Sequence, residues 1–151
     1  MRVKADVEVL QQIPLFAESE AVHLQLLSFS STMVDLDPGS ILFQKGAIGA
    51  AAFLVLAGTA EIYEDAEAAG EVVATAESGA LLGELSMIAD VAYGFTVKTT
   101  SAFTAKRIDR DLFIRLAAEF PDFGRGIIRN IAVRLGRSIE ALREVKPLFQ
   151  T

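Results

Sequence analysis

Residues 42–63, LFQKGAIGAAAFLVLAGTAEIY, decide the fold of this chain. Two apolar runs, 51–56 and 60–63, lie on either side of the turn signal AGTA, and the segment KGAIG precedes them. Apolar runs of this length, bounded by glycine-containing turns, are typical of β-strands. Similar runs recur at residues 33–36, 41–43, 72–74, 95–99 and 103–108. Short strands at this spacing predict a β-sandwich or barrel of roughly eight strands between about residues 32 and 108.

Helical patterns precede the predicted strands. Residues 6–12 and 19–30 have helical spacing, and Ser19 is the expected N-cap of the second helix. The apolar face expected for that helix consists of Val22, Leu24, Leu26 and Leu27.

Two more helices are predicted after the strands, at about residues 109–145. Asp109 caps the first, which ends before Pro121, and Pro147 stops the second. The second helix carries an apolar stripe formed by Ile128, Ile131, Leu135, Ile139 and Leu142. The sequence leaves two interpretations of this stripe open, because it can pack on the strands or form the seam of a homodimer.

Composition and charge restrict the function. Hydrophobic residues make up 52% of the 151 residues, enough for the core of one domain, which we assign to residues 1–151. The net charge of −6 argues against nucleic acid as the principal partner, because phosphate binding needs Lys and Arg. The charge is uneven: residues 1–105 carry 4 basic and 14 acidic side chains, and residues 106–151 carry 10 and 6.

Other features concern the location of the protein. The chain has no cysteine, which fits a reducing cytoplasm and excludes disulfides and thiolate metal sites. The N-terminal MRVKADVEVLQQ lacks the apolar segment of a signal peptide. The most apolar stretch, residues 47–60, is interrupted by two glycines and is shorter than the roughly 20 residues of a membrane helix. We therefore expect a soluble, cytoplasmic protein without membrane association.

Four local patterns, in the right order, resemble the cyclic-nucleotide-binding domains. Residues 42–63 resemble the hairpin in which paired glycines precede a strand of the form F-x-V/I-x-x-G. Residues 82–86, LGELS, resemble the opening of the phosphate-binding cassette, and residues 111–121 resemble the helix after the barrel. The PLF of residues 14–16 also lies where this family places it.

The resemblance covers about residues 8–145 and implies a mainly β fold with flanking α-helices. It implies a double-stranded β-helix (jelly-roll) barrel with N-terminal helices and two C-terminal helices. Such a domain is the effector domain of catabolite-activator-like regulators.

The cassette supplies the candidate ligand site. Gly83 allows a ligand to approach the backbone, and the residues after it begin a short helix whose free N–H groups can receive an anion. Ionised Glu84 can only accept hydrogen bonds, and the resemblance implies that it binds a ribose hydroxyl. The ligand-binding residues predicted in the cassette are Gly83, Glu84, Leu85, Ser86, Tyr93 and Gly94. The resemblance implies cyclic AMP or cyclic GMP as the ligand, and no cofactor or metal is expected.

Position 93 departs from the family pattern. The family cassette has an arginine nine residues after its glutamate, and alignment without a gap places Tyr93 there. No Arg or Lys occurs between Lys45 and Lys98. Loss of a charge-assisted contact worth about 1.5–3 kcal/mol predicts phosphate binding that is weaker by roughly one to two orders of magnitude. The sequence therefore leaves open whether a cyclic nucleotide binds.

The last predicted helix offers a second source of positive charge. Arg125 and Arg129 lie one turn apart on it, and in the family this helix packs over the mouth of the pocket. We therefore include Arg129 among the candidate ligand-binding residues. The other interpretation is that both arginines are solvated or pair with acidic side chains.

The sequence argues against an enzyme and against a DNA-binding protein. The single histidine, His23, lies on a predicted helix and is expected to be partly exposed, so neither a metal site nor a Ser-His-Asp triad can be assembled. After the last helix only residues 146–151 follow, too few for the companion of a recognition helix, so no direct DNA binding is expected.

The sequence thus predicts a non-enzymatic regulatory domain, in which binding of a cyclic nucleotide or another small ligand moves the C-terminal helices. The alternative is a domain that kept the fold, lost the ligand and serves as a protein-interaction or dimerisation module.

Overall fold

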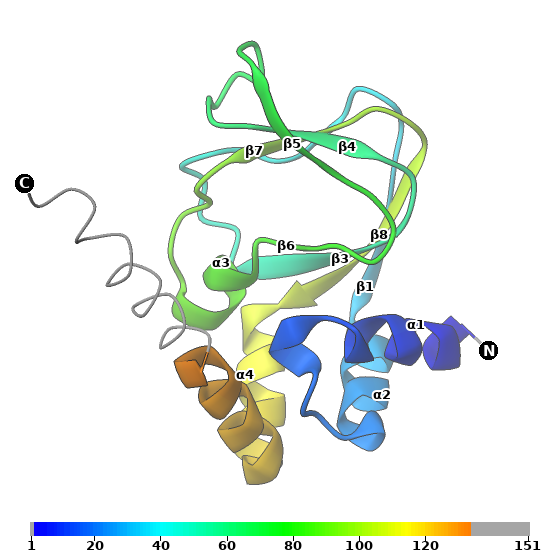
Figure 1. Ribbon diagram of the computed structural model, residues 1–151, viewed down its shortest axis with the longest axis vertical. Coiled ribbons are helices and arrows are strands. Elements are labelled where there is room, and N and C mark those ends of the chain that lie inside the picture. Colours follow the sequence, from blue (N-terminus) through cyan, green and yellow to red (C-terminus); the bar gives the residue numbers. More distant parts are fainter. Residues whose placement is uncertain (1, 134–151) are drawn as a thin grey trace, which may run out of the picture.

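The computed structural model describes residues 2–133, in which helices enclose one side of a β-roll (Figure 1). The elements are α1 Arg2–Gln11, the 3-10 helix η1 Pro14–Phe16, α2 Ala21–Ser30, β1 Thr32–Leu36, β2 Ile41–Phe43, β3 Ala51–Ala57, β4 Ala60–Tyr63, β5 Val72–Ala76, β6 Leu81–Leu82, α3 Glu84–Ala89, β7 Thr96–Thr99, β8 Phe103–Asp109 and α4 Arg110–Glu119. Residues 121–133 are also helical.

The eight strands form two antiparallel sheets that pack face to face. One sheet has the order β1-β8-β3-β6, and the other has the order β2-β7-β4-β5. Residues 42–63 contain β3 and β4, but the expected hairpin is not formed, because the two strands belong to different sheets and each pairs with other strands. The mainly β fold with flanking helices is confirmed, but the two sheets do not close into the expected barrel.

Strand β3 is apolar throughout because both of its faces are covered. Phe53 and Val55 point between the sheets and belong to the core there, together with Phe103 of β8. Ala52 and Leu54 point the other way, into a second core shared with the helices. The alternation of a strand's side chains explains why no polar residue interrupts this run.

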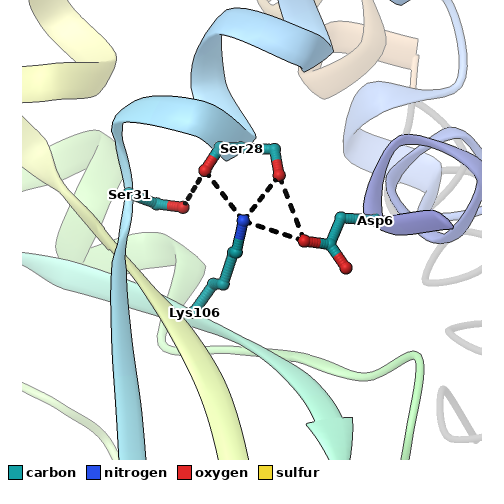
Figure 2. Close-up of polar contacts among 4 residues, drawn as sticks. All are labelled: Asp6, Ser28, Ser31 and Lys106. Carbon is teal, nitrogen blue, oxygen red and sulfur yellow. Dashed lines mark hydrogen bonds and ion pairs between the residues drawn. The ribbon is translucent and has the colours of Figure 1, made fainter. Parts of the chain in front are cut away.

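Helices α1, α2 and α4 lie on the outer side of the β1-β8-β3-β6 sheet (Figure 1). Their attachment includes a buried polar cluster, in which Lys106 of β8 lies between Asp6 of α1 and Ser28 of α2 (Figure 2). Lys106 Nζ lies 2.8 Å from Asp6 Oδ2 and donates to the carbonyl and the hydroxyl of Ser28 at 3.0 and 2.9 Å. The cluster ties both N-terminal helices to one strand.

Two predictions for α2 are wrong. Its N-cap is Glu20 rather than Ser19, and no side chain caps the helix. Leu24 and Leu27 are buried, whereas Val22 and Leu26, expected on the same apolar face, are exposed. The reason is geometric, because residues three apart lie on the same face of a helix. Leu24 and Leu27 share the face that packs on the core, and Val22 and Leu26 lie on the outer face.

The helices after the strands begin close to where the sequence predicts. Asp109 is the N-cap of α4, but its carboxylate accepts a hydrogen bond from Arg107 Nε at 2.7 Å instead of capping the helix. In the helix at 121–133, Ile127 is buried and Ile131 packs against the core, while Ile128 is 68% exposed. Leu135, Ile139 and Leu142 of the predicted stripe lie outside the described residues.

None of the helices within residues 2–133 combines the length and hydrophobicity that crossing a membrane requires.

Candidate functional site

A cavity of about 290 Å³ lies beside α3, and we call it the cassette cavity. Its lining residues are Leu81, Gly83, Glu84, Leu85, Ser86, Val91, Ala92, Tyr93, Gly94 and Phe95. The structure therefore brings together six of the seven predicted site residues, all of them from the segment that resembles a phosphate-binding cassette.

Local backbone geometry explains how the segment folds around the cavity. Gly83 is the N-cap of α3 and has φ of +76°, a left-handed conformation that suits glycine. Its carbonyl accepts hydrogen bonds from the N–H groups of Ser86 and Met87, which closes the first turn of α3. The Ser86 hydroxyl donates to the carbonyl of Val91 and holds the chain after α3 against the helix.

Tyr93 forms the inner wall of the cavity and is only 5% exposed. Its ring stacks on Phe43 of β2, with 3.9 Å between the ring centroids and 12° between the ring planes. Its hydroxyl donates to the carbonyl of Ala51 at 2.8 Å. Burial raises the pKa of the Tyr93 hydroxyl, so the group remains a protonated donor at neutral pH.

Two glycines make room for the Tyr93 ring. A β-carbon at Gly49 would lie 2.5 Å from the Tyr93 hydroxyl oxygen, and one at Gly83 would lie 2.7 Å from Tyr93 Cε1. Real β-carbons essentially never come so close to another atom. The ring is thus enclosed by Gly49, Gly83 and Phe43. It fills the space that side chains at positions 49 and 83 would otherwise occupy.

The charges around the cavity do not fit a phosphate. Among the residues that the structure describes, Glu84 is the only charged one in its lining. The guanidinium groups of Arg107 and Arg110 are used elsewhere: Arg107 binds Asp109 and the Gly49 carbonyl, and Arg110 binds the carbonyls of Met87 and Ile88. Because an anion needs partners that donate or carry positive charge, and the hydroxyls of Ser86 and Tyr93 already have acceptors, the side chains that residues 2–133 contribute to the lining do not form a cradle for a cyclic phosphate.

Arg129 lies apart from the cassette cavity. Its guanidinium faces the carboxylate of Glu18 at 3.6 Å and lines a separate cavity of about 180 Å³ together with His23 and Asp122. Arg125 pairs with Asp122. The arrangement follows the second interpretation of these arginines, pairing with acidic side chains.

His23 is also placed differently from expectation. It is only 7% exposed and packs against the rings of Phe120 and Phe123, so the prediction of a partly exposed residue is wrong. Within residues 2–133, no group of three His, Asp or Glu side chains lies close enough to hold a metal ion.

The sequence did not point to Arg110 or Phe43, which contact the cassette segment without lining its cavity. Phe43 is distant from the cassette along the chain, and its contact with Tyr93 follows from the pairing of β2 with β7. Arg110 begins α4, and its bonds to α3 depend on how the two helices pack. No local pattern in the sequence signals either contact.

Comparison with known proteins shows to which domain family the fold and the cassette belong. The family model described as cyclic nucleotide-binding domain matches residues 33–120. The chain is 27% identical over 107 residues to a cAMP-dependent protein kinase regulatory subunit of Yarrowia lipolytica. The aligned residues cover 71% of this chain and 28% of that protein.

Solved structures share the fold. The N-terminal domain of a transcriptional regulator from Streptomyces coelicolor superimposes with a TM-score of 0.81 at 22% identity, covering 88% of this chain and 93% of that one. A cyclic nucleotide-binding-like protein from Brucella abortus gives 0.67 at 28% identity, covering 76% and 98%.

The chain spans between 8% and 28% of the length of the curated relatives it matches. The family match, in contrast, extends from β1 through α4 and includes the whole cassette. The chain belongs to the cyclic nucleotide-binding domain family.

Proposed function

We propose that the chain is a non-enzymatic regulatory domain of the cytoplasm, in which a small ligand in the cassette cavity changes the position of α4 and the helix after it. Its principal support is the contact between Arg110 and α3. Ligand binding can move these helices only if the ligand prefers one of their positions over another. A contact that joins the ligand site to the helices supplies such a preference.

Arg110 joins the two elements directly. It is the first residue of α4, and its guanidinium donates to the carbonyls of Met87 and Ile88 in α3. Helix α3 in turn carries three residues of the cavity lining, Glu84, Leu85 and Ser86. A ligand that displaces α3 also displaces the two carbonyls, so the bonds to Arg110 must follow or break.

An Arg110→Gln variant tests the coupling. In the wild-type protein, a bound ligand should shift the amide NMR signals of both α3 and α4. In the variant, the α3 signals should still respond and the α4 signals should not. Arg115→Gln is the matched control, because Arg115 is an exposed residue of the same helix. Equal α4 responses in all three proteins would contradict the proposal.

The second candidate function is a protein-interaction or dimerisation module that binds no nucleotide. Residues 2–133 contribute no cation to the cavity lining, which favours this function, as does the apolar outer face of α2. On that face Val22, Leu26 and Phe29 are exposed, Phe29 by 78%.

Calorimetric titration separates the two functions. Saturation below about 100 μM, a binding free energy near 5.5 kcal/mol, supports the sensor, whether the compound is cyclic AMP, cyclic GMP or tryptamine, a small aromatic amine chosen because the cavity walls are mostly apolar. Absence of heat with all three compounds up to millimolar concentration supports the module.

A further inference from the structure

The Tyr93 ring cannot leave the cassette cavity without losing several contacts at once. Its face is stacked on Phe43, its hydroxyl is bonded to the Ala51 carbonyl, and its edges lie against Gly49 and Gly83. A phosphate in the cavity therefore meets a fixed aromatic wall. The single donor of that wall, the Tyr93 hydroxyl, is already bonded to the Ala51 carbonyl. A ligand of this cavity must accept the ring as an apolar surface.

The other walls have the same character. Leu81, Leu85, Val91 and Phe95 add aliphatic and aromatic surface to the lining. Mostly apolar walls with a few polar groups are the usual lining of a site for small organic molecules, and about 290 Å³ is at the lower end of the range for such sites. The space suits a compound of one or two fused rings.

Glu84 gives the cavity its polarity. Within residues 2–133 it is the one charged residue of the lining, and an ionised carboxylate can only accept hydrogen bonds. The guanidinium groups of Arg107 and Arg110 do not offset it for a ligand, because neither residue lines the cavity and both are bonded to other groups. An anion in the cavity is repelled by Glu84, whereas an N–H or O–H donor, charged or neutral, gains a partner there.

We infer that the cassette cavity selects a small aromatic compound that is cationic or uncharged and carries an N–H or O–H donor, and that it rejects phosphate esters. This inference rests on the proposed function, since it names the class of ligand for the same site. The juxtaposition that carries it is a fixed aromatic wall, Tyr93, and a carboxylate, Glu84, in the lining of one cavity to which residues 2–133 contribute no cation.

A series of indoles with one scaffold and three charges tests the inference. Tryptamine is a cation at neutral pH, tryptophol is uncharged and indole-3-acetate is an anion. Binding is measured by calorimetry and by the amide NMR shifts of Gly83, Ser86 and Gly94, with cyclic AMP as the phosphate ester. Tryptamine should bind roughly tenfold more tightly than indole-3-acetate, and tryptophol should lie between them.

Glu84→Gln is the diagnostic variant, because it removes the charge and keeps the size of the side chain. The preference for tryptamine over indole-3-acetate should fall to about twofold or less, while tryptophol, which is uncharged and can still donate to the amide oxygen, should lose less affinity than tryptamine. Glu119→Gln is the matched control, since Glu119 is exposed on α4 and does not line the cavity. It should keep the wild-type order.

The outcomes separate this inference from the proposed function. If cyclic AMP or indole-3-acetate binds as tightly as tryptamine and shifts the α4 signals, the inference is overturned and the proposed function stands. If the series binds in the expected order without any response in α4, the inference stands and the proposed coupling is wrong. If none of the compounds perturbs the cavity amides, both are overturned.

Discussion

Lys106 Nζ lies 2.8 Å from Asp6 Oδ2, and both side chains are buried between the N-terminal helices and the sheet (Figure 2). Ser28 completes the cluster by accepting two hydrogen bonds from Lys106 and donating one to Asp6 at 3.2 Å. Because all three groups have partners, the cluster fixes one position of α1 and α2 on β8 that an apolar contact alone would specify less sharply.

Replacing Asp6 should be costly. Asp6→Ala leaves the Lys106 ammonium buried without its counter-charge, and the free energy of unfolding should fall by about 3–5 kcal/mol. The double replacement Asp6→Leu with Lys106→Met should cost much less, because no charge is left unpaired. Urea denaturation measures both.

The control for Asp6 is Asp122→Ala, which removes the exposed pair of Arg125 and Asp122 and should change stability by about 0–1 kcal/mol. A double variant as unstable as Asp6→Ala would show that the cluster does more than balance a buried charge.

Tyr93→Phe should destabilise the fold by about 1–3 kcal/mol at neutral pH, because the buried Ala51 carbonyl loses its donor. Burial raises the pKa of Tyr93 above its ordinary value near 10.0, so folding favours the protonated hydroxyl. Its contribution is fully present below pH 10 and is lost as the pH rises through the raised pKa.

Denaturation curves of wild type and Tyr93→Phe at a series of pH values measure this effect. The wild-type advantage should shrink above pH 10. An advantage that stays constant across the alkaline range would contradict the assignment.

Gly49→Ala should destabilise the protein by about 1–3 kcal/mol, because the new methyl group overlaps the Tyr93 hydroxyl. Most of that loss should disappear when the same substitution is made in a Tyr93→Ala background, where the ring is absent. Gly94→Ala is the control, since a β-carbon there meets no atom within 4 Å. Additive effects of Gly49→Ala and Tyr93→Ala in the thermal melts would rule out the overlap.

The exposed Ile128 leads us to expect a homodimer through the helix that contains residues 121–133. Light scattering after size exclusion should detect dimers at high micromolar concentration, and Ile128→Glu should shift the population toward monomers by placing a charge in the seam. Arg125→Gln, an exposed neighbour on the same helix, should leave the population unchanged. A wild-type chain that stays strictly monomeric would dispose of this seam.

The strands were the most predictable part of the fold. The bounds of β2 and β4 agree with the expected runs at 41–43 and 60–63, because turn residues flank each of them. Strand β6 was missed, since its two residues are too few to show a period. Apolar runs and turn signals thus suffice to predict a strand that has turn residues at both ends. They fail for β6, which is defined only by its pairing with β3.

The site was predictable only within the cassette. Residues 83–94 are close in sequence and had to be close in space, so their gathering around one cavity follows from the local turn at Gly83. Arg129 and His23 were misjudged because their surroundings depend on which face each helix presents to its neighbours. For the same reason the sequence did not show that Ile127 is buried and that Ile128 is exposed.

The close fit of Tyr93 with Gly49 and Gly83 also limits how this domain can evolve. An arginine at position 93 on its own would leave the Ala51 carbonyl without its donor and a space between two residues that have no side chain to fill it. An exchange of Tyr93 therefore calls for compensating changes at its neighbours, because the single replacement leaves a buried carbonyl and a space unfilled. Substitutions at Glu84 or Leu85, which line the cassette cavity and make none of the contacts described for the ring, should be tolerated more readily.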